Sequence, residues 1–249
     1  MSPELLSVEE VTVEYEGFRA LDGVTMQIRP RELRVLIGPN GAGKSTLLDA
    51  ITGRIRPAAG CIRLDGRDIT HRSEHERARL GIQRKFQAPS LLEALTVEEN
   101  VRLAVRAGEG WRGLVRRAAR EVEDAVERAL HLVGLYPKRH LRAAFLSHGE
   151  KQWLEIGMVV ATRPRLVLLD EPTAGMTQDE TARTAELVRE LAVQHAVLVI
   201  EHDMDFVGRL GAPVSVLHMG RVLREGSLDG IRADPEVRAI YLGRVGTEC

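Results

Sequence analysis

The stretch Gly38-Pro39-Asn40-Gly41-Ala42-Gly43-Lys44-Ser45 decides how this chain folds. It matches the pattern G-x-x-x-x-G-K-[ST], follows an apolar run that ends at Ile37, and opens a run with helical character, 44–52. Glycines let backbone N–H groups approach an anion closely, and the helix dipole points its positive end at the same place. We therefore expect a phosphate-binding loop in which Lys44 neutralises the β- and γ-phosphates and Ser45 offers its hydroxyl to Mg²⁺. The alternative is a glycine-rich turn without a ligand.

Strand-like and helix-like segments alternate on both sides of this loop. We expect strands at 5–15, 24–28, 33–37, 60–68, 81–85, 165–169, 196–200, 214–218 and 222–224, and helices at 44–52, 73–80, 178–193 and 203–210. Between them, apolar residues from Val115 to Val133 recur at spacings of three and four, which is typical of an amphipathic helix. The pattern predicts an α/β fold with a largely parallel sheet and a mostly helical segment at 88–162.

Polar groups follow two of the predicted strands. Asp170 and Glu171 come directly after the apolar run 166–169, and His202 comes after the run 196–200. Parallel strands deliver such residues to one edge of the sheet, where ligands bind. Two acids after a strand are by themselves often a solvated loop, and a lone histidine is often structural. Beside a phosphate loop, we expect Asp170 to hold Mg²⁺, Glu171 to orient or deprotonate the attacking water, and His202 to sense the γ-phosphate.

Composition excludes several classes of protein. The chain has 249 residues and a net charge of −1, which does not favour a nucleic-acid partner. Two cysteines form no disulfide framework and suggest a reducing compartment. We see no signal peptide and no apolar run long enough to span a bilayer. His71 and His75 have helical metal-ligand spacing, but no third ligand is evident.

The segment Leu146-Ser147-His148-Gly149-Glu150, called the signature segment below, precedes a helical run, 151–162. Ser147 and Glu150 have the spacing of a capping box, so one interpretation is a well-capped helix. A capped helix N-terminus also attracts anions, which is the functional interpretation.

The order of these motifs over nearly the whole chain resembles the ATP-binding-cassette (ABC) ATPases, whose signature usually reads Leu-Ser-Gly-Gly-Gln. The resemblance implies ATP and Mg²⁺ as cofactors. It assigns ATP binding to Tyr15, which would stack on adenine, to Gly38, Pro39, Asn40, Gly41, Ala42, Gly43, Lys44, Ser45 and Thr46, and to Ser147, Gly149 and Glu150. It assigns Mg²⁺ to Ser45, Gln87 and Asp170, and catalysis to Lys44, Gln87, Glu171 and His202.

The same resemblance implies the architecture of a P-loop NTPase cassette. It predicts a mostly parallel core sheet, an antiparallel β subdomain and a helical subdomain within one domain, 1–249. The core lobe would comprise 1–87 and 163–249, and the helical subdomain with the signature segment would comprise 88–162.

The chain departs from the family pattern at two places. His148 and Glu150 replace a glycine and a glutamine of the signature, and Thr177 stands where an aspartate is usual. These departures leave open how two active sites communicate. They also resemble the ATPases that drive uptake of branched-chain amino acids and urea. The segments 84–87 and 201–207 look most similar to the urea-type member.

A member of this group would work in a head-to-tail pair, either two copies or one copy with a related ATPase. Its partners would be transmembrane permeases, contacted near Gln87 and the leucines 91, 92 and 95, and indirectly a periplasmic or extracellular solute-binding protein. It would sit on the cytoplasmic side of the cell membrane and drive uptake of urea, short-chain amides or branched-chain amino acids. The alternatives are an exporter ATPase for lipid or polysaccharide, a non-transport ABC ATPase, and a binding module without hydrolysis.

Overall fold

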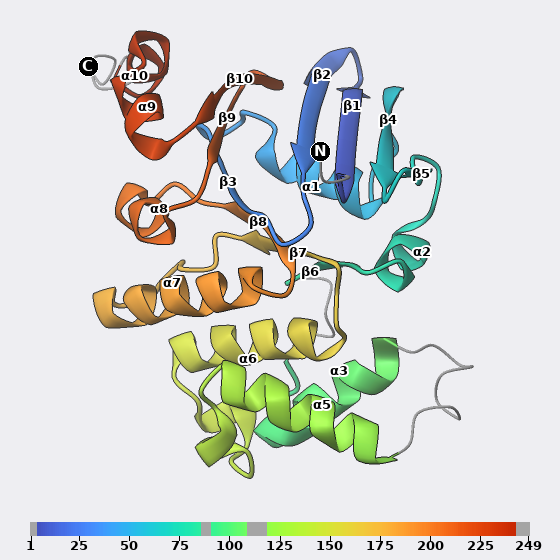
Figure 1. The fold of residues 1–249 in the computed structure, drawn as a ribbon, viewed down its shortest axis with the longest axis vertical. Helices are drawn as coiled ribbons and strands as arrows, with labels where there is room; N and C mark the ends of the chain where they lie inside the picture. Colours follow the sequence, from blue (N-terminus) through green and yellow to red (C-terminus); the bar gives the residue numbers. More distant parts are fainter. Residues whose placement is uncertain (1–3, 86–90, 109–118, 243–249) are drawn as a thin grey trace.

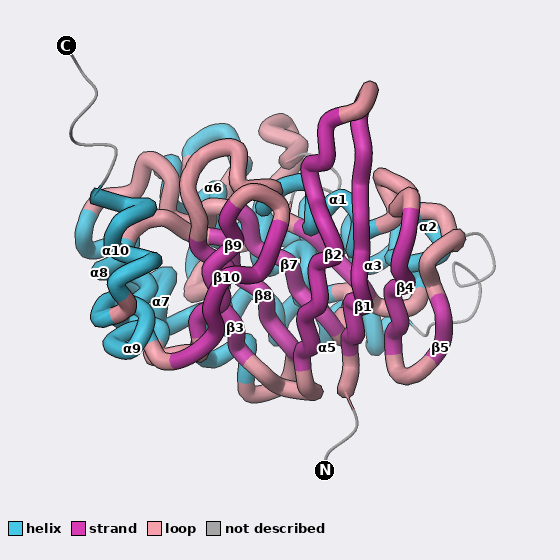
Figure 2. Tube along the Cα trace, turned by 90° about the horizontal axis from the view of Figure 1, so that it is seen from above, coloured by secondary structure: helices cyan, strands magenta, loops and turns pink. Residues whose placement is uncertain are grey.

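A computed structural model describes residues 4–85, 91–108 and 119–242, which form two sheets and a layer of helices (Figure 1). The smaller sheet has the order β2-β1-β4-β5 and antiparallel pairing. Its strands are β1 (Leu6–Tyr15), β2 (Phe18–Ile28), β4 (Ala59–Leu64) and β5 (Arg67–Asp68). The hairpin of β1 and β2 extends beyond the other strands when the molecule is seen from above (Figure 2).

The larger sheet has the order β10-β9-β3-β8-β7-β6. Its strands are β3 (Leu33–Ile37), β6 (Ile82–Arg84), β7 (Leu166–Asp170), β8 (Ala196–Ile200), β9 (Val214–His218) and β10 (Arg221–Gly226). The pairs from β9 to β6 are parallel, and only the edge pair of β9 and β10 is antiparallel. The expected mostly parallel core sheet and antiparallel β subdomain are therefore confirmed, and the two last predicted strands do close the sheet.

Alternate side chains of the central strands pack into two different hydrophobic cores. Val197 and Val199 of β8 pack into a core with the helices, whereas Ala196, Leu198 and Ile200 pack toward the smaller sheet and α1 (Lys44–Thr52). Side chains of a strand alternate between its faces, so a strand buried on both faces reads as a continuous apolar run. The runs at 166–169 and 196–200 have this origin.

The remaining helices cover the larger sheet and its edges. They are α2 (Glu74–Arg79), α3 (Val97–Gly108), α5 (Ala119–Leu132), α6 (His148–Ala161), α7 (Gln178–Ala192), α8 (Met204–Leu210), α9 (Leu228–Ala233) and α10 (Pro235–Leu242). Helices α3, α5 and α6 pack on one another and form the lowest part of the molecule in Figure 1. Of the predicted amphipathic face, Val122, Val126 and Ala129 of α5 are buried, as is Val133 directly after it, whereas Val115 lies outside the described residues.

Most predicted segments coincide with observed elements, and the differences have local causes. Strand β2 starts at Phe18 and not at 24, because its hydrogen-bonded pairing with β1 carries it through exposed residues that show no apolar pattern. Helices α9 and α10 were not expected: α9 is too short for a helical period, and a proline opens α10. Within the described residues, no helix combines the length and apolar character needed to cross a bilayer.

Candidate nucleotide site

The phosphate loop joins β3 to α1 with the geometry that its glycines permit. Gly43 has φ 104°, and a Cβ at this position would lie 2.6 Å from the carbonyl oxygen of Ala20, so a side chain there is excluded. Lys44 donates hydrogen bonds from Nζ to the carbonyl oxygens of Gly38 (2.7 Å) and Pro39 (3.0 Å). Burial lowers the pKa of Lys44, while the nearby carboxylates of Glu171 and Asp170 oppose that shift. The loop thus orients its own ammonium group.

This loop forms one wall of a cavity of about 390 Å³, called the nucleotide pocket below. The lining residues come from β1, β2, the loop, β7 and β8: Tyr15, Phe18, Ala20, Asn40, Gly41, Ala42, Gly43, Lys44, Ser45, Thr46, Asp170, Glu171 and Ile200. The structure therefore brings Tyr15, most of the loop and both acids together, as the sequence predicted. Gly38 and Pro39 contribute carbonyl groups to Lys44 and do not line the pocket.

Two aromatic side chains stand at the outer end of the pocket. Tyr15 ends β1 and Phe18 begins β2, and the two are direct partners across the antiparallel pair. Both are exposed, Tyr15 by 45% and Phe18 by 67%. Sequence reasoning identified Tyr15 and missed Phe18, although the tight turn between them at Glu16–Gly17 was a signal that they share one face. The pair offers a flat apolar surface for a planar ring.

Asp170, the predicted Mg²⁺ ligand, is tied to a buried arginine that the sequence did not reveal. Arg84 at the end of β6 donates from Nη2 to Oδ2 of Asp170 and from Nη1 to Oδ1 of Asp49 on α1, each at 2.6 Å. The arginine side chain is 8% exposed. These two bonds lock β6, α1 and β7 together around the pocket.

The oxygen donors on this wall fit a magnesium ion. Asp170 retains its second carboxylate oxygen, and the hydroxyl-bearing Ser45 lines the same pocket. Mg²⁺ prefers oxygen ligands and usually takes one or two carboxylates together with water and substrate phosphates. No group of three or more His, Cys, Asp or Glu residues in the described ranges could hold a metal by protein ligands alone. Gln87, the third expected ligand, lies outside the described residues.

Glu171 and His202 face each other across the ends of β7 and β8. The Nδ1 atom of His202 lies 3.6 Å from Oε1 of Glu171, and the two side chains are 69% and 47% exposed. Glu171 adopts a left-handed backbone conformation with φ 45°, held by a hydrogen bond from its N–H to the carbonyl of Ile200. Such a conformation is unfavourable for a residue with a Cβ and is often found at functional sites. Glu171 lines the nucleotide pocket in this conformation.

A buried carboxylate that the sequence analysis did not single out supports this pair from behind. Glu201 is 1% exposed and accepts four hydrogen bonds. Two come from Thr173, from its hydroxyl (2.6 Å) and its N–H (3.3 Å), and two come from the N–H groups of His202 (3.0 Å) and Asp203 (3.4 Å). Glu201 therefore connects the loop after Glu171 to the loop that carries His202. The sequence feature that could have indicated Glu201 is an acidic residue directly after a fully apolar strand.

The signature segment begins α6 with the capping box that its spacing predicted. The hydroxyl of Ser147 accepts from the N–H of Glu150 (3.2 Å), and Oε2 of Glu150 accepts from the N–H of Ser147 (3.1 Å). The other oxygen of Glu150 accepts a hydrogen bond from Lys138 at 2.5 Å. Both carboxylate oxygens are thus engaged by protein groups, so the acid is turned toward its own cap.

The signature segment contacts the loop that leads to Thr177, the second departure from the family pattern. Nε2 of His148 lies 3.1 Å from the carbonyl oxygen of Ala174, in the loop after Glu171. Thr177 caps α7 by accepting from the N–H of Glu180, and Glu180 also accepts a hydrogen bond from Ser147 at 3.4 Å. In place of the usual glycine and aspartate, this chain connects its signature segment directly to its own catalytic loop and to α7.

The signature residues are not part of the nucleotide pocket. Ser147, Gly149 and Glu150 stand at the start of α6, and the pocket lining in the described chain includes none of them. A Cβ at Gly149 would lie 2.4 Å from Oε1 of Glu180, so a side chain there would require that carboxylate to move. The signature segment and the nucleotide pocket are therefore separate surfaces of the chain.

Comparisons with known proteins agree with this geometry. A family model described as "ABC transporter" matches residues 21–174. The high-affinity branched-chain amino acid transport ATP-binding protein BraF of Pseudomonas aeruginosa is 35% identical, over 98% of this chain and 99% of BraF. A probable branched-chain amino acid transport ATP-binding protein, LivG of Methanocaldococcus jannaschii, is 32% identical, over 96% of this chain and 98% of LivG.

A solved structure shares the fold. It is described as the ADP conformation of MJ1267, an ATP-binding cassette of an ABC transporter. It has a TM-score of 0.84 and 30% sequence identity, and the match covers 96% of this chain and 99% of that one. With the family model and the full-length relatives, this likeness establishes that the chain belongs to the ABC transporter family, as an ATP-binding cassette that hydrolyses ATP.

Proposed function

We propose that this chain is the motor subunit of an importer and uses ATP hydrolysis to move a small polar solute through partner permeases. The observation that carries the proposal is the nucleotide pocket, where Lys44 and Ser45 lie in one lining with Asp170 and Glu171. A loop that binds phosphate, a carboxylate for a metal and a carboxylate for water are the parts that phosphoryl transfer to water requires.

The proposed roles follow from where each group lies. Tyr15, with Phe18 beside it, stacks on the adenine ring, and the backbone N–H groups of 40–46 surround the phosphates with Lys44. Glu171 takes a proton from the attacking water, and His202, 3.6 Å from it, holds that water and the γ-phosphate in line. Mg²⁺ held by Ser45 and Asp170, and by Gln87 as the sequence predicts, would neutralise charge on the phosphates.

Two chains complete the site in this proposal. Ser147, Gly149 and Glu150 lie on a surface apart from the nucleotide pocket, so the signature segment of a second cassette would cover the nucleotide bound by the first. The pair would be either two copies or one copy with a related ATPase. The contact of His148 with Ala174 would carry the state of one site to the other, because it joins the signature segment to the loop after Glu171.

The permease contact is placed beside the helical part of the chain. We propose a core lobe of 1–87 and 163–249 and a helical subdomain of 88–162, with the permease meeting the junction near Gln87. Leu92 is 44% exposed there and is available to a partner, whereas Leu91 packs against the core. Through such partners the chain would lie on the cytoplasmic side of the cell membrane, with a solute-binding protein on the other side.

Two cargoes remain within one group. The names of BraF and LivG favour branched-chain amino acids. The segments Arg84–Gln87 and Glu201–Val207 favour urea, by their resemblance to the urea-type ATPase. An exporter for lipid or polysaccharide is the alternative outside this group.

Uptake of labelled leucine and labelled urea separates these cargoes. We would compare wild-type cells with cells that carry Glu171→Gln at the native locus, using Glu190→Gln, an exposed residue near the end of α7, as a matched control. Loss of leucine uptake alone supports branched-chain amino acids, and loss of urea uptake alone supports urea. If neither falls while the purified variant has lost ATP hydrolysis, the chain is not the motor of this importer, and exported lipid or glycan is measured instead.

A further inference from the structure

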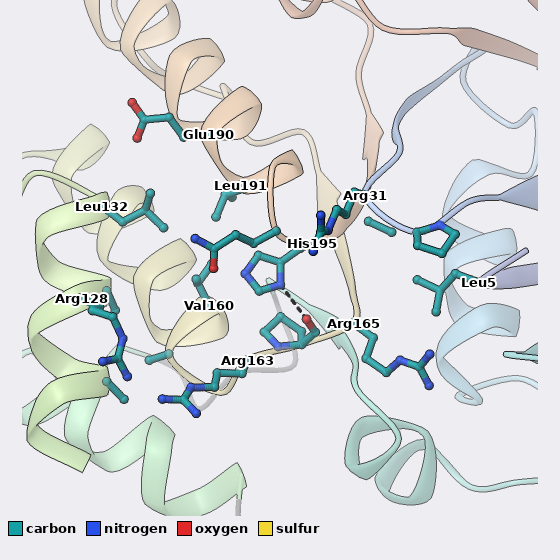
Figure 3. A pocket seen from close by; sticks show the side chains of 17 residues that line it. Leu5, Arg31, Arg128, Leu132, Val160, Arg163, Arg165, Glu190, Leu191 and His195 are labelled. Carbon is teal, nitrogen blue, oxygen red and sulfur yellow. Dashed lines mark hydrogen bonds between the residues drawn. The ribbon is translucent and has the colours of Figure 1, made fainter. Parts of the chain in front are cut away.

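A second, larger cavity lies at the opposite edge of the six-stranded sheet from the nucleotide pocket. Its volume is about 670 Å³, and it opens where β7 and β8 begin, beside Arg165 and Ala196 (Figure 3). The nucleotide pocket lies where the same strands end, at Asp170 and Ile200. Small-molecule sites have volumes of about 300–1,000 Å³. We call this second site the arginine cavity.

The floor of the arginine cavity is apolar and comes from three helices. Leu132 and Ala129 belong to α5, and Val160 and Leu191 lie in the last turns of α6 and α7. Val160 is 9% exposed and Leu191 is 1% exposed. Figure 3 shows Leu132, Val160 and Leu191 side by side on the helices that face the cavity. An apolar group that entered here would touch the helical layer and the sheet edge together.

The rim of the cavity carries an excess of positive charge. Four arginines line it: Arg31, Arg128, Arg163 and Arg165. Arg165 pairs with Asp65 at 3.2 Å, whereas the guanidinium groups of the other three have no hydrogen bond or ion pair within the residues that the structure describes. Glu190 is the one acid among the lining residues, and its carboxylate points outward from His195 in Figure 3. These exposed cations around one cleft create a positive potential that attracts an anion.

Two of these arginines occupy backbone positions that favour glycine. Arg31 has φ 60° and Arg163 has φ 56°. Arg163 follows Thr162, the C-cap of α6. The position after a C-cap is usually glycine, because a left-handed backbone is unfavourable for any residue that has a Cβ. Both positions hold an arginine although the left-handed backbone is unfavourable for it, and both arginines line the same cavity. A purely structural turn would not require arginine at either place.

A fixed imidazole stands in the middle of the cavity. Nδ1 of His195 lies 2.6 Å from the carbonyl oxygen of Pro164, which can only accept, so Nδ1 carries the proton. This bond orients the ring, as the dashed line in Figure 3 shows, and leaves Nε2 for a second polar contact. His195 thus adds a directed polar group between the arginines and the apolar floor.

We propose that the arginine cavity binds a small organic anion, with an acidic head held by Arg31, Arg128 and Arg163 and an apolar body lying against Leu132, Val160 and Leu191. This site is separate from the nucleotide pocket and does not depend on the cargo of the transporter. Its occupant bridges α5, α6 and α7 to the amino-terminal ends of β7 and β8.

The direct test measures binding of anilinonaphthalene sulfonate, a fluorescent apolar anion, to the purified chain with saturating ATP present. We expect one class of site with ATP bound, displaced by octanoate about tenfold more effectively than by octanol, since the two share a chain and differ in charge. Displacement by octanol equal to that by octanoate would overturn the proposal, and so would loss of all dye binding when ATP is added.

The double variant Arg31→Gly/Arg163→Gly separates ligand binding from structure. Glycine suits both backbones, so the melting temperature is expected to hold or rise, while dye affinity falls about tenfold or more through the loss of two charged contacts. Arg56→Gly, in an exposed loop outside the cavity, is the matched control and is expected to leave dye affinity unchanged. Wild-type dye affinity in the double variant would overturn the assignment of the arginines.

Discussion

The two edges of the six-stranded sheet differ in whether their charged side chains are bound by other protein groups. Where the strands end, charged groups are held by protein partners: Arg84 lies between two carboxylates, Glu201 accepts four hydrogen bonds, and Lys44 is bound by two carbonyl groups. Where the strands begin, Arg31 and Arg163 are exposed, and within the described residues their guanidinium groups form no hydrogen bond or ion pair.

The difference teaches what each edge is built to do. At the carboxyl edge Lys44, Arg84 and Glu201 are already fixed before a ligand arrives, which is what stabilising a transition state requires. At the amino edge Arg31, Arg128 and Arg163 are exposed and have no side-chain partner among the described residues, which suits reversible binding of an anion. Each of the following variants alters one edge and leaves the other as its internal control.

The largest expected effect is on turnover in Glu171→Gln. An amide cannot take the proton from water, so the rate of ATP hydrolysis should fall by about 10²- to 10⁴-fold while ATP affinity is retained. Steady-state ATPase assays and nucleotide titration measure the two quantities separately. Glu190→Gln at the other edge should hydrolyse ATP at the wild-type rate. Near-normal hydrolysis in Glu171→Gln would remove Glu171 as the general base.

The next effect is on stability in Arg84→Met. Methionine is apolar and comparable in length, but it leaves Asp49 and Asp170 without their shared cation. Removing one partner from a buried ion pair costs about 3–5 kcal/mol of unfolding free energy. Arg102→Met is the contrast, because Arg102 and Glu123 form an exposed pair, worth about 0–1 kcal/mol. Equal losses in the two variants, measured by urea denaturation, would show that Arg84 does not hold the carboxyl edge together.

A smaller effect is expected for Glu201→Gln. Glutamine matches the shape but offers one acceptor oxygen, and its amide group would face donors such as the hydroxyl of Thr173. Leaving such buried donors unsatisfied costs about 1–3 kcal/mol. Because the loops of Glu171 and His202 both rest on this carboxylate, kcat should fall while KM for ATP changes little. An unchanged melting curve together with unchanged kcat would leave Glu201 without a positioning role.

The sequence predicted the parts of the carboxyl edge that depend on neighbouring residues. The phosphate loop, the capping box of Ser147 and Glu150, and the acids after β7 all show in a short linear pattern. Arg84 binds Asp49 and Asp170, 35 and 86 positions away, and Glu201 binds Thr173, 28 positions away. Pairings over such distances in the sequence are set by the order of the strands in the sheet. Strand order leaves no periodic pattern in the sequence from which it could be predicted.

The amino edge left even less trace in the sequence. Arg31, Arg128 and Arg163 belong to three separated segments, and an arginine in a loop is ordinarily a solvated surface residue. Their convergence depends on how α5 and the end of α6 pack against the start of β7. The left-handed conformation at Arg163 was also hidden, because the usual glycine is absent there. The motifs could therefore predict the nucleotide pocket, whereas only the packed structure reveals the arginine cavity.

The smallest effect distinguishes the two kinds of arginine in that cavity. Arg163→Gly relieves a left-handed strain of about 1–2 kcal/mol, which stabilises the folded state. The greater backbone freedom of glycine in the unfolded chain destabilises the folded state by about 0.4–1 kcal/mol. The free energy of unfolding is therefore expected to rise by about 0.5 kcal/mol. Arg128→Gly makes the same change inside α5, where glycine costs about 1 kcal/mol. Urea denaturation should thus move in opposite directions while dye affinity falls in both. A loss of stability in Arg163→Gly would mean that its side chain is retained for packing and not for a ligand.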